Sequence, residues 1–136
     1  MIHHRGTEGT EEADNRISQE IIGAAVEVHR ALGPGLLESG YQACLAHELT
    51  LRGLRSEQQR ELPLAYKGIA LRNGYRIDLL VEGRIVVEVK AVQSIEAVHR
   101  AQLLTYLKLL DRRIGLLINF NVEILVHGVR RIVNGY

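Results

Sequence analysis

The sequence predicts an α+β domain in which helices flank a mixed β-sheet. Two observations carry this prediction. Apolar residues recur every three or four positions over residues 16–52 and 94–110, and at shorter, strand-like intervals over residues 57–90 and 113–133. The expected order of elements is ααββββαβββ, which indicates one layered fold. A chain of 136 residues suits one domain and is short for two.

Two helices are expected before any strand. In the first, over residues 16–32, the apolar side chains share one helical face: Ile17, Ile21, Ala25, Val28 and Leu32. Gly33-Pro34-Gly35 ends this helix, and a second one is expected over about residues 36–52. Residues 1–15 are polar and acidic, so we expect a flexible tail there and a single domain over residues 16–136.

Strand-like spacing begins after the second helix. The four expected strands are residues 57–62, 64–71, 75–81 and 84–90. Asn73-Gly74 and Glu82-Gly83 are typical hairpin turns, so we expect antiparallel neighbours at both places.

A third helix and three closing strands complete the prediction. Ser94 can cap a helix that runs to about Leu110, because apolar residues again follow helical spacing there. The strands that follow are expected at residues 113–120, 122–126 and 129–133. The first of them is almost wholly apolar, so we expect it inside the sheet.

Charge and composition narrow the classes of partner. Residues 1–27 carry 2 basic and 6 acidic side chains, or −4, and the rest carry 15 basic and 10 acidic, or +5. This positive excess is compatible with a phosphate-bearing partner and equally with an ordinary solvated surface. No stretch approaches the roughly 20 apolar residues of a membrane helix, and the N-terminus does not read as a signal peptide, so no membrane and a cytoplasmic location are expected. Cys44 is the only cysteine, which excludes an internal disulfide and favours a buried thiol.

The strand over residues 84–90 presents two charges among apolar residues. Because side chains alternate along a strand, Val86, Glu88 and Lys90 share one face. Burying either charge unpaired would be costly. Two explanations stay open: Glu88 and Lys90 pair within the protein, or a cation and a substrate phosphate complete their network.

The turn between two strands decides whether Asp78 joins Glu88. A two-residue turn at Glu82-Gly83 would pair Asp78 with Val87 and leave Glu88 on the opposite face. A three-residue loop over residues 81–83, with Gly83 left-handed in a G1 bulge, would place both carboxylates on one face. We expect this second register, because only it brings the charges together.

Two carboxylates on one face form a hard oxygen site. Such a site suits Mg²⁺ or Mn²⁺, and no cysteine or histidine pair stands at the spacing that zinc requires. Its chemistry is the attack of water on a phosphodiester, in which Lys90 can orient the nucleophile or offset the growing negative charge. A structural charge network without metal is the competing interpretation.

Further motifs resemble a known family. Residues 35–41 read G-x-x-E-x-x-Y, and the remaining similar motifs are Tyr66-Lys67-Gly68, residues 76–81, Glu88-Val89-Lys90, Ala101-Gln102 and residues 115–120. With them the chain resembles the GxxExxY family from about Ile17 to Val133. That family is placed in the PD-(D/E)XK nuclease superfamily, whose restriction-endonuclease-like fold has an αβββαβ core.

The resemblance implies roles for particular residues. Asp78, Glu88 and Lys90 match the catalytic signature, and Glu38 matches a first-helix acid that joins Asp78 and Glu88 in holding the metal. Gln102 and Tyr106, four residues apart on one helical face, resemble a Q-x-x-x-Y motif of the exonuclease-like branch. They are expected to position substrate together with Tyr41, although both tyrosines also suit a core. Ile77 stands where the superfamily's name has proline.

The implied function is Mg²⁺-dependent hydrolysis of phosphodiester bonds in nucleic acid, with DNA as the expected substrate and Mn²⁺ able to replace Mg²⁺. The alternative is a non-catalytic module that keeps the nuclease fold and binds nucleic acid or protein. A domain this small has limited surface for gripping a duplex, so a homodimer or a partner protein is a further expectation.

Overall fold

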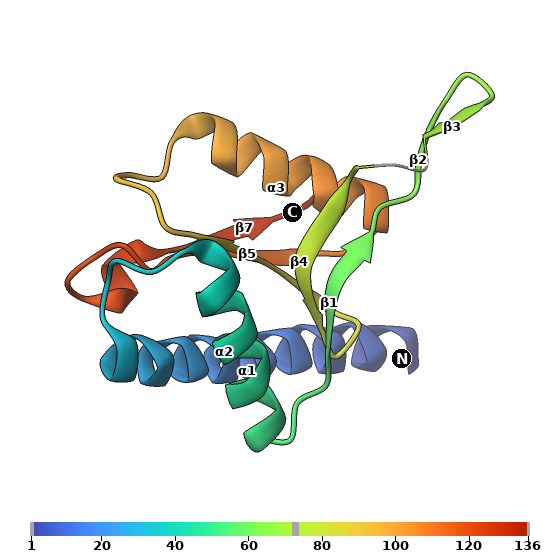
Figure 1. Ribbon diagram of the computed structural model, residues 1–136. Coiled ribbons are helices and arrows are strands. Elements are labelled where there is room, and N and C mark those ends of the chain that lie inside the picture. Colours follow the sequence, from blue (N-terminus) through green and yellow to red (C-terminus); the bar gives the residue numbers. More distant parts are fainter. Residues whose placement is uncertain (1, 72–73, 136) are drawn as a thin grey trace.

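The computed structural model describes residues 2–71 and 74–135, with side chains from residue 9 onward (Figure 1). The described helices are α1 (Ile2–Leu32), α2 (Glu38–Leu51) and α3 (Ala97–Leu110), with a short 3₁₀ helix η1 (Leu125–Gly128). The described strands are β1 (Ser56–Glu61), β2 (Leu64–Tyr66), β3 (Ile69–Leu71), β4 (Arg76–Val81), β5 (Ile85–Lys90), β6 (Ile114–Asn119) and β7 (Val129–Val133). No helix in the described part of the chain is long and apolar enough to cross a membrane.

A mixed five-stranded sheet forms the middle layer of the fold. Its strand order is β1-β4-β5-β6-β7, and the parallel pair β5–β6 is joined through α3, as parallel neighbours require. Helices α1 and α2 pack on one face, and α3 covers the other (Figure 1). The predicted α+β class is confirmed. The αβββαβ core is present as α2, β1, β4, β5, α3 and β6.

Alternation along the strands sends the two sets of side chains to different helices. Leu79 and Val87 pack with α1 and α2, whereas Leu80 and Val86 pack with α3. Every residue of β6 is buried, and this strand lies between β5 and β7, inside the sheet as predicted.

A hairpin replaces the single strand expected over residues 64–71. Lys67 and Gly68 have positive φ angles of 46° and 87°, the backbone of a tight hairpin turn, so the segment folds back as β2 and β3. The pair forms its own sheet, inserted between β1 and β4, and it projects from the body (Figure 1). The turn expected at Asn73-Gly74 lies partly outside the described residues.

Helix α1 is longer than predicted. It begins at Ile2, whereas the sequence predicted a helix from Arg16, and this boundary is wrong. Asp14 lies on α1 within the segment that we expected to be a solvated tail. It accepts hydrogen bonds from Arg84 and Arg113, which hold it against the sheet. The division into a flexible tail over residues 1–15 and a domain over residues 16–136 stays a prediction.

Three local predictions are also wrong. Helix α3 begins at Ala97, because Glu96 rather than Ser94 caps it in a reciprocal capping box with His99. Residues 122–126 form no strand, because the chain turns there into η1. Cys44 is exposed, because the buried face of α2 is formed by other residues: Tyr41, Leu45, Ala46 and Leu49.

Candidate functional site

The β4–β5 register brings Asp78 and Glu88 to the same face. Leu79 pairs with Val87 and Val81 with Ile85, so the next position along the two strands sets Asp78 opposite Glu88. The shared face was predicted correctly. The loop is residues 82–84 rather than 81–83, because Glu82 and Gly83 both have positive φ, at 54° and 64°.

The regular ladder between β4 and β5 opens at this acid pair. The backbone N–H of Asp78 donates to Glu88 Oε2 at 2.8 Å, and the N–H of Val89 donates to Asp78 Oδ2 at 2.7 Å. Each carboxylate therefore accepts a backbone hydrogen bond from the strand that carries the other. This exchange fixes one oxygen of each acid and leaves the second for other partners.

Burial sets the electrostatics of the pair. Burial, followed by the charge of Asp78, raises the pKa of Glu88 to about 8, and the side chain is only 5% exposed. Burial also raises the pKa of Asp78, although the Val89 N–H opposes this shift. None of the ion pairs among the described residues includes Asp78 or Glu88. Two acids therefore share one site without a neutralising arginine.

Glu38 and Lys90 complete the charged group. Glu38 is the first residue of α2, and its Oε2 accepts a hydrogen bond from the Ala91 N–H at 3.1 Å. Its charge contributes to the raised pKa of both Asp78 and Glu88. Lys90 ends β5, is half-buried, and has the opposite effect on both acids. The structure thus brings together all four predicted charged residues.

Helix α3 covers the acid pair with Tyr106. Burial first, and then the charges of Glu88, Tyr75 and Asp78, raise the pKa of the Tyr106 hydroxyl. This hydroxyl therefore lies within electrostatic range of both carboxylates. Gln102 lies one turn earlier on α3 and is exposed. Its position fits the predicted contact with substrate, which stays a prediction.

Tyr41 does not line this group. Its ring is fully buried among the residues packed between the sheet and the α1–α2 pair, stacked on Phe120 at 4.5 Å between centroids. Its hydroxyl donates to the Gly33 carbonyl and accepts from the Leu36 N–H. Tyr41 therefore anchors the loop before α2, which places Glu38 at the start of that helix.

Gln59 is a site residue that the sequence did not reveal. It lies on β1 between two pairs of the β1–β4 ladder, opposite Asp78, with a left-handed φ of 53°. Its Nε2 donates to Asp78 Oδ1 at 3.2 Å and to Gln42 Oε1 at 2.8 Å. Only the β1–β4 register shows this contact, because nothing in the polar run of β1 distinguishes Gln59 from its neighbours.

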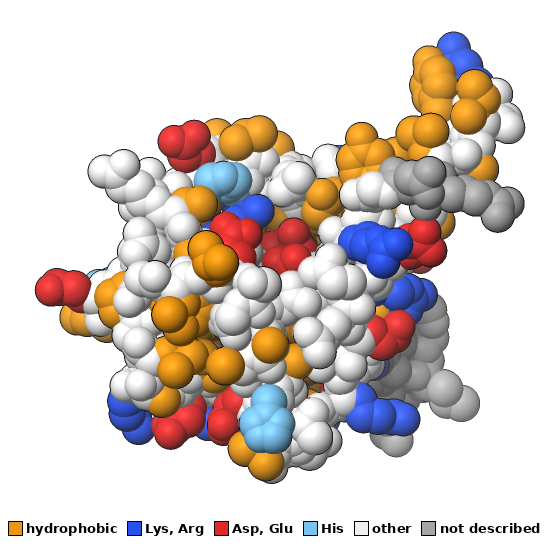
Figure 2. Space-filling model, in the orientation of Figure 1, with side chains coloured by type: hydrophobic (Ala, Val, Ile, Leu, Met, Phe, Trp, Pro, Cys, Tyr) orange, Lys and Arg blue, Asp and Glu red, His pale blue; other side chains and the backbone are white. Residues whose placement is uncertain are grey.

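The donor chemistry of the pair fits a hard cation. Among the described residues, no group of three or more His, Cys, Asp and Glu side chains is arranged to hold a metal ion. Mg²⁺ is commonly held by one or two carboxylates, with water and substrate phosphates as its other ligands. Asp78 and Glu88 meet that requirement. Glu38, the third metal ligand that the resemblance implied, accepts a hydrogen bond from the Ala91 N–H, and its role in holding a metal stays a prediction. Figure 2 shows acidic side chains gathered in the middle of this face, beside a basic one.

Helices on both faces of a mixed sheet, with an acid pair and a lysine on adjacent strands, define a fold of the restriction-endonuclease type. The family model of the PD-(D/E)XK nuclease superfamily matches residues 15–132, and the chain belongs to this superfamily. Its members are typically metal-dependent.

The fold is shared with a protein of known structure. The crystal structure of SSO0001 is similar with a TM-score of 0.53 and 20% identity, over 73% of this chain and 48% of that one. This chain therefore spans about half the length of that protein, and the likeness bears on the fold alone. No curated protein matches the sequence.

Proposed function

We propose that this protein is a nuclease that hydrolyses phosphodiester bonds in DNA with Mg²⁺, which Mn²⁺ can replace. The observation that carries this proposal is the opening of the β4–β5 ladder at two opposed carboxylates, Asp78 and Glu88. Neither acid forms an ion pair with an arginine in the described part of the chain. Superfamily membership supports the same chemistry. The G-x-x-E-x-x-Y motif further favours the GxxExxY branch of the superfamily.

A purely structural role explains the acid pair poorly. Burying two carboxylates side by side disfavours their charged forms, and this costs folding stability at neutral pH. A divalent cation would remove that cost, since it favours both ionised acids and attracts a phosphate to the same place. The pair is therefore better explained as a binding site than as part of the folding core.

Each site residue has a distinct task in this proposal. Asp78 and Glu88 would hold the ion, with Glu38 at its rim, in orientations fixed by the Val89 and Asp78 N–H groups. When bound, such an ion lowers the pKa of a coordinated water and offsets charge on the phosphate. Lys90 directs a positive charge at the attacking water and the phosphate.

Helix α3 supplies the substrate contacts. The Tyr106 hydroxyl and the exposed Gln102 amide lie one turn apart on the helix that covers the acid pair. Both groups can donate hydrogen bonds to a phosphodiester backbone. They would hold the DNA strand across the acid pair.

The test is cleavage of labelled single-stranded and duplex DNA in Mg²⁺, Mn²⁺ or EDTA. We expect metal-dependent products that fall roughly 100-fold or more in Asp78→Asn and in Lys90→Ala, because each variant loses a group that acts on the transition state. Glu123→Gln and Lys108→Ala are matched controls, since both remove an exposed charge outside the site. Equal cleavage by Asp78→Asn and wild type, or no cleavage with either metal, would overturn the proposal.

A further inference from the structure

The β2–β3 hairpin exposes apolar side chains. Four of the twelve exposed large hydrophobic residues in the described part of the chain lie here or at its base: Tyr66, Ile69, Leu71 and Tyr75. Tyr66 and Ile69 are 63% and 62% exposed. Figure 2 shows this hydrophobic surface on the projection at the upper right, with a basic side chain at its tip.

This surface is not explained by the fold of the chain itself. A two-stranded hairpin is marginally stable in water unless something packs against it. A solvated hairpin alternates apolar and polar residues, yet both strands here are apolar throughout, as LAY and IAL. Contiguous exposed apolar surface marks an interaction site. We therefore expect a ligand to bind the hairpin and cover its apolar side chains.

The hairpin adjoins the acid pair. The Leu62 N–H donates to the Tyr75 carbonyl at 2.9 Å, which closes the base of the insertion, and Asp78 follows three residues later on β4. The charge of Tyr75 is one of those that raise the pKa of Tyr106, after burial and Glu88. Tyr75, at the base of the hairpin, is therefore within electrostatic range of Tyr106, which is buried near the carboxylates.

The tip combines an aromatic ring with a cation. The Lys67 ammonium lies 5.3 Å from the centroid of the Tyr66 ring. Proteins that bind single-stranded nucleic acid stack bases on aromatic rings and hold the phosphates with cations. Aliphatic side chains such as Ile69 also insert between bases. One lysine among apolar residues suits unpaired bases better than the charged backbone of a duplex.

We infer that the β2–β3 hairpin binds unpaired bases of the DNA whose phosphodiester lies at Asp78 and Glu88. Tyr66 stacks on a base and Lys67 contacts a neighbouring phosphate. This inference rests on the proposed function and deepens it, because it names DNA with single-stranded segments as the substrate class.

The first experiment measures binding in EDTA, where no metal-dependent cleavage occurs. Fluorescence anisotropy of a labelled oligothymidine should show that Tyr66→Ala weakens binding about 5- to 150-fold, the range for loss of one stacked base. Tyr66→Phe keeps the ring and should bind like wild type. Leu51→Ala removes an equally exposed apolar side chain from the end of α2 and should have no effect. Undiminished binding by Tyr66→Ala would overturn the inference.

A second readout separates this inference from the proposed function. Methyl p-nitrophenyl phosphate is a phosphodiester without a base, so Tyr66→Ala should hydrolyse it at the wild-type rate while losing oligonucleotide binding. Failure of wild type to hydrolyse either substrate would overturn the proposed function, whereas the hairpin is judged by binding alone. If Tyr66→Ala instead changes a dimer into a monomer in sedimentation and binds DNA unchanged, the hairpin joins copies of the chain and the inference is wrong.

Discussion

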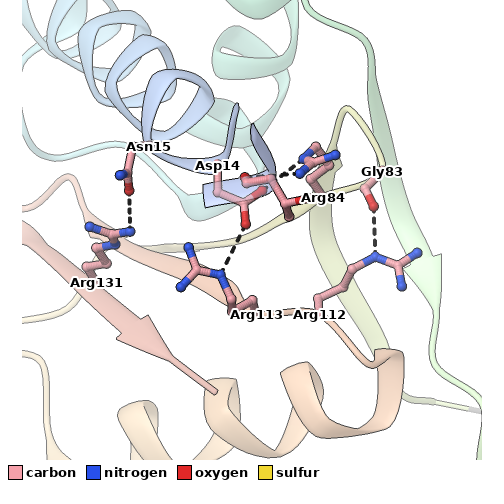
Figure 3. Close-up of polar contacts among 8 residues, drawn as sticks. Asp14, Asn15, Gly83, Arg84, Arg112, Arg113 and Arg131 are labelled. Atoms are coloured by element: carbon pink, nitrogen blue, oxygen red, sulfur yellow. Dashed lines mark hydrogen bonds and ion pairs between the residues drawn. The ribbon is translucent and has the colours of Figure 1, made fainter. Parts of the chain in front are cut away.

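The two ends of the β4–β5 hairpin treat buried acids in opposite ways. At the end that carries the Glu82-Gly83 turn, Asp14 is 4% exposed, and its carboxylate accepts from Arg84 Nε at 2.8 Å and from Arg113 Nε at 3.3 Å (Figure 3). At the other end, Asp78 and Glu88 are paired with each other instead. Two arginines form ion pairs with the acid at one end, whereas at the other end the charge of Lys90 only partly offsets that of the two acids.

The arginine end joins distant parts of the chain. Arg112 Nε donates to the Gly83 carbonyl at 2.7 Å, and Arg131 donates to Asn15 Oδ1 at 2.7 Å (Figure 3). Together with the Asp14 ion pairs, these bonds tie α1, the β4–β5 turn and the start of β6 into one unit. Internal arginines thus satisfy the buried acid of a structural network. The Asp78–Glu88 pair forms no such ion pair among the described residues, and we propose that an external cation binds there.

The largest loss of stability is expected from Asp14→Asn. The substitution leaves Arg84 and Arg113 without their shared carboxylate in a partly buried place, so we expect a loss of about 2 to 3 kcal/mol in the free energy of unfolding. Urea unfolding gives the value, with Glu27→Gln as control, because the Glu27–Arg30 pair is exposed and contributes little. DNA cleavage by the folded fraction should stay at the wild-type rate. Equal stability of Asp14→Asn and the control would contradict the structural role.

An effect of opposite sign is expected at Glu88. Its pKa is about 8 in the folded protein and 4.5 ordinarily, so the folded state without metal holds this proton more tightly than the unfolded state. The stability that this bound proton contributes is fully present below pH 4.5 and is lost as the pH rises to about 8. In EDTA, Glu88→Gln should therefore gain on wild type by about 3 °C or more in Tm between pH 5 and pH 8. If the difference in Tm between Glu88→Gln and wild type is the same at pH 5 and pH 8, ionisation of Glu88 does not destabilise the folded protein and the prediction is wrong.

The smallest effect on stability, with a clear effect on activity, is expected at Gln59. Gln59→Gly relieves a left-handed backbone and should not lower stability, but it removes the amide that holds Asp78 Oδ1. We expect metal-dependent cleavage to fall roughly three- to tenfold, since one hydrogen bond orients the acid. Gln58→Ala, one residue away and bonded to Gln42 rather than Asp78, is the control. Equal activity in both variants would remove Gln59 from the site.

Much of the fold followed from local spacing. Helical periodicity located the body of all three helices, and the continuous apolar run of β6 predicted an interior strand. The β2–β3 hairpin was missed because its turn uses Lys67, a side chain with no turn signal, in a left-handed conformation. The position of the β4–β5 loop was missed for the same reason, because Glu82 also has a positive φ.

The part of the site that lies on a single strand could be predicted from the sequence. Glu88 and Lys90 are two residues apart, so the period of a strand places them on one face in any fold. The face on which Asp78 lies depends on whether the turn before β5 has an even or an odd number of residues. We chose the odd number because it clusters the charges, and this choice was correct. Gln59 and the bonds that open the ladder depend on two different strand pairings, and no spacing in the sequence reports those.

The sequence by itself determined the layers of this protein and the face shared by Glu88 and Lys90, because both follow from periods of a few residues. Only the tertiary structure decided which acids are compensated. Asp14 meets arginines 70 and 99 residues away, whereas Asp78 meets Glu88 across an opened ladder. Such pairings depend on the register and packing of distant segments, and that long-range geometry paired Asp14 with two arginines and set Asp78 beside Glu88.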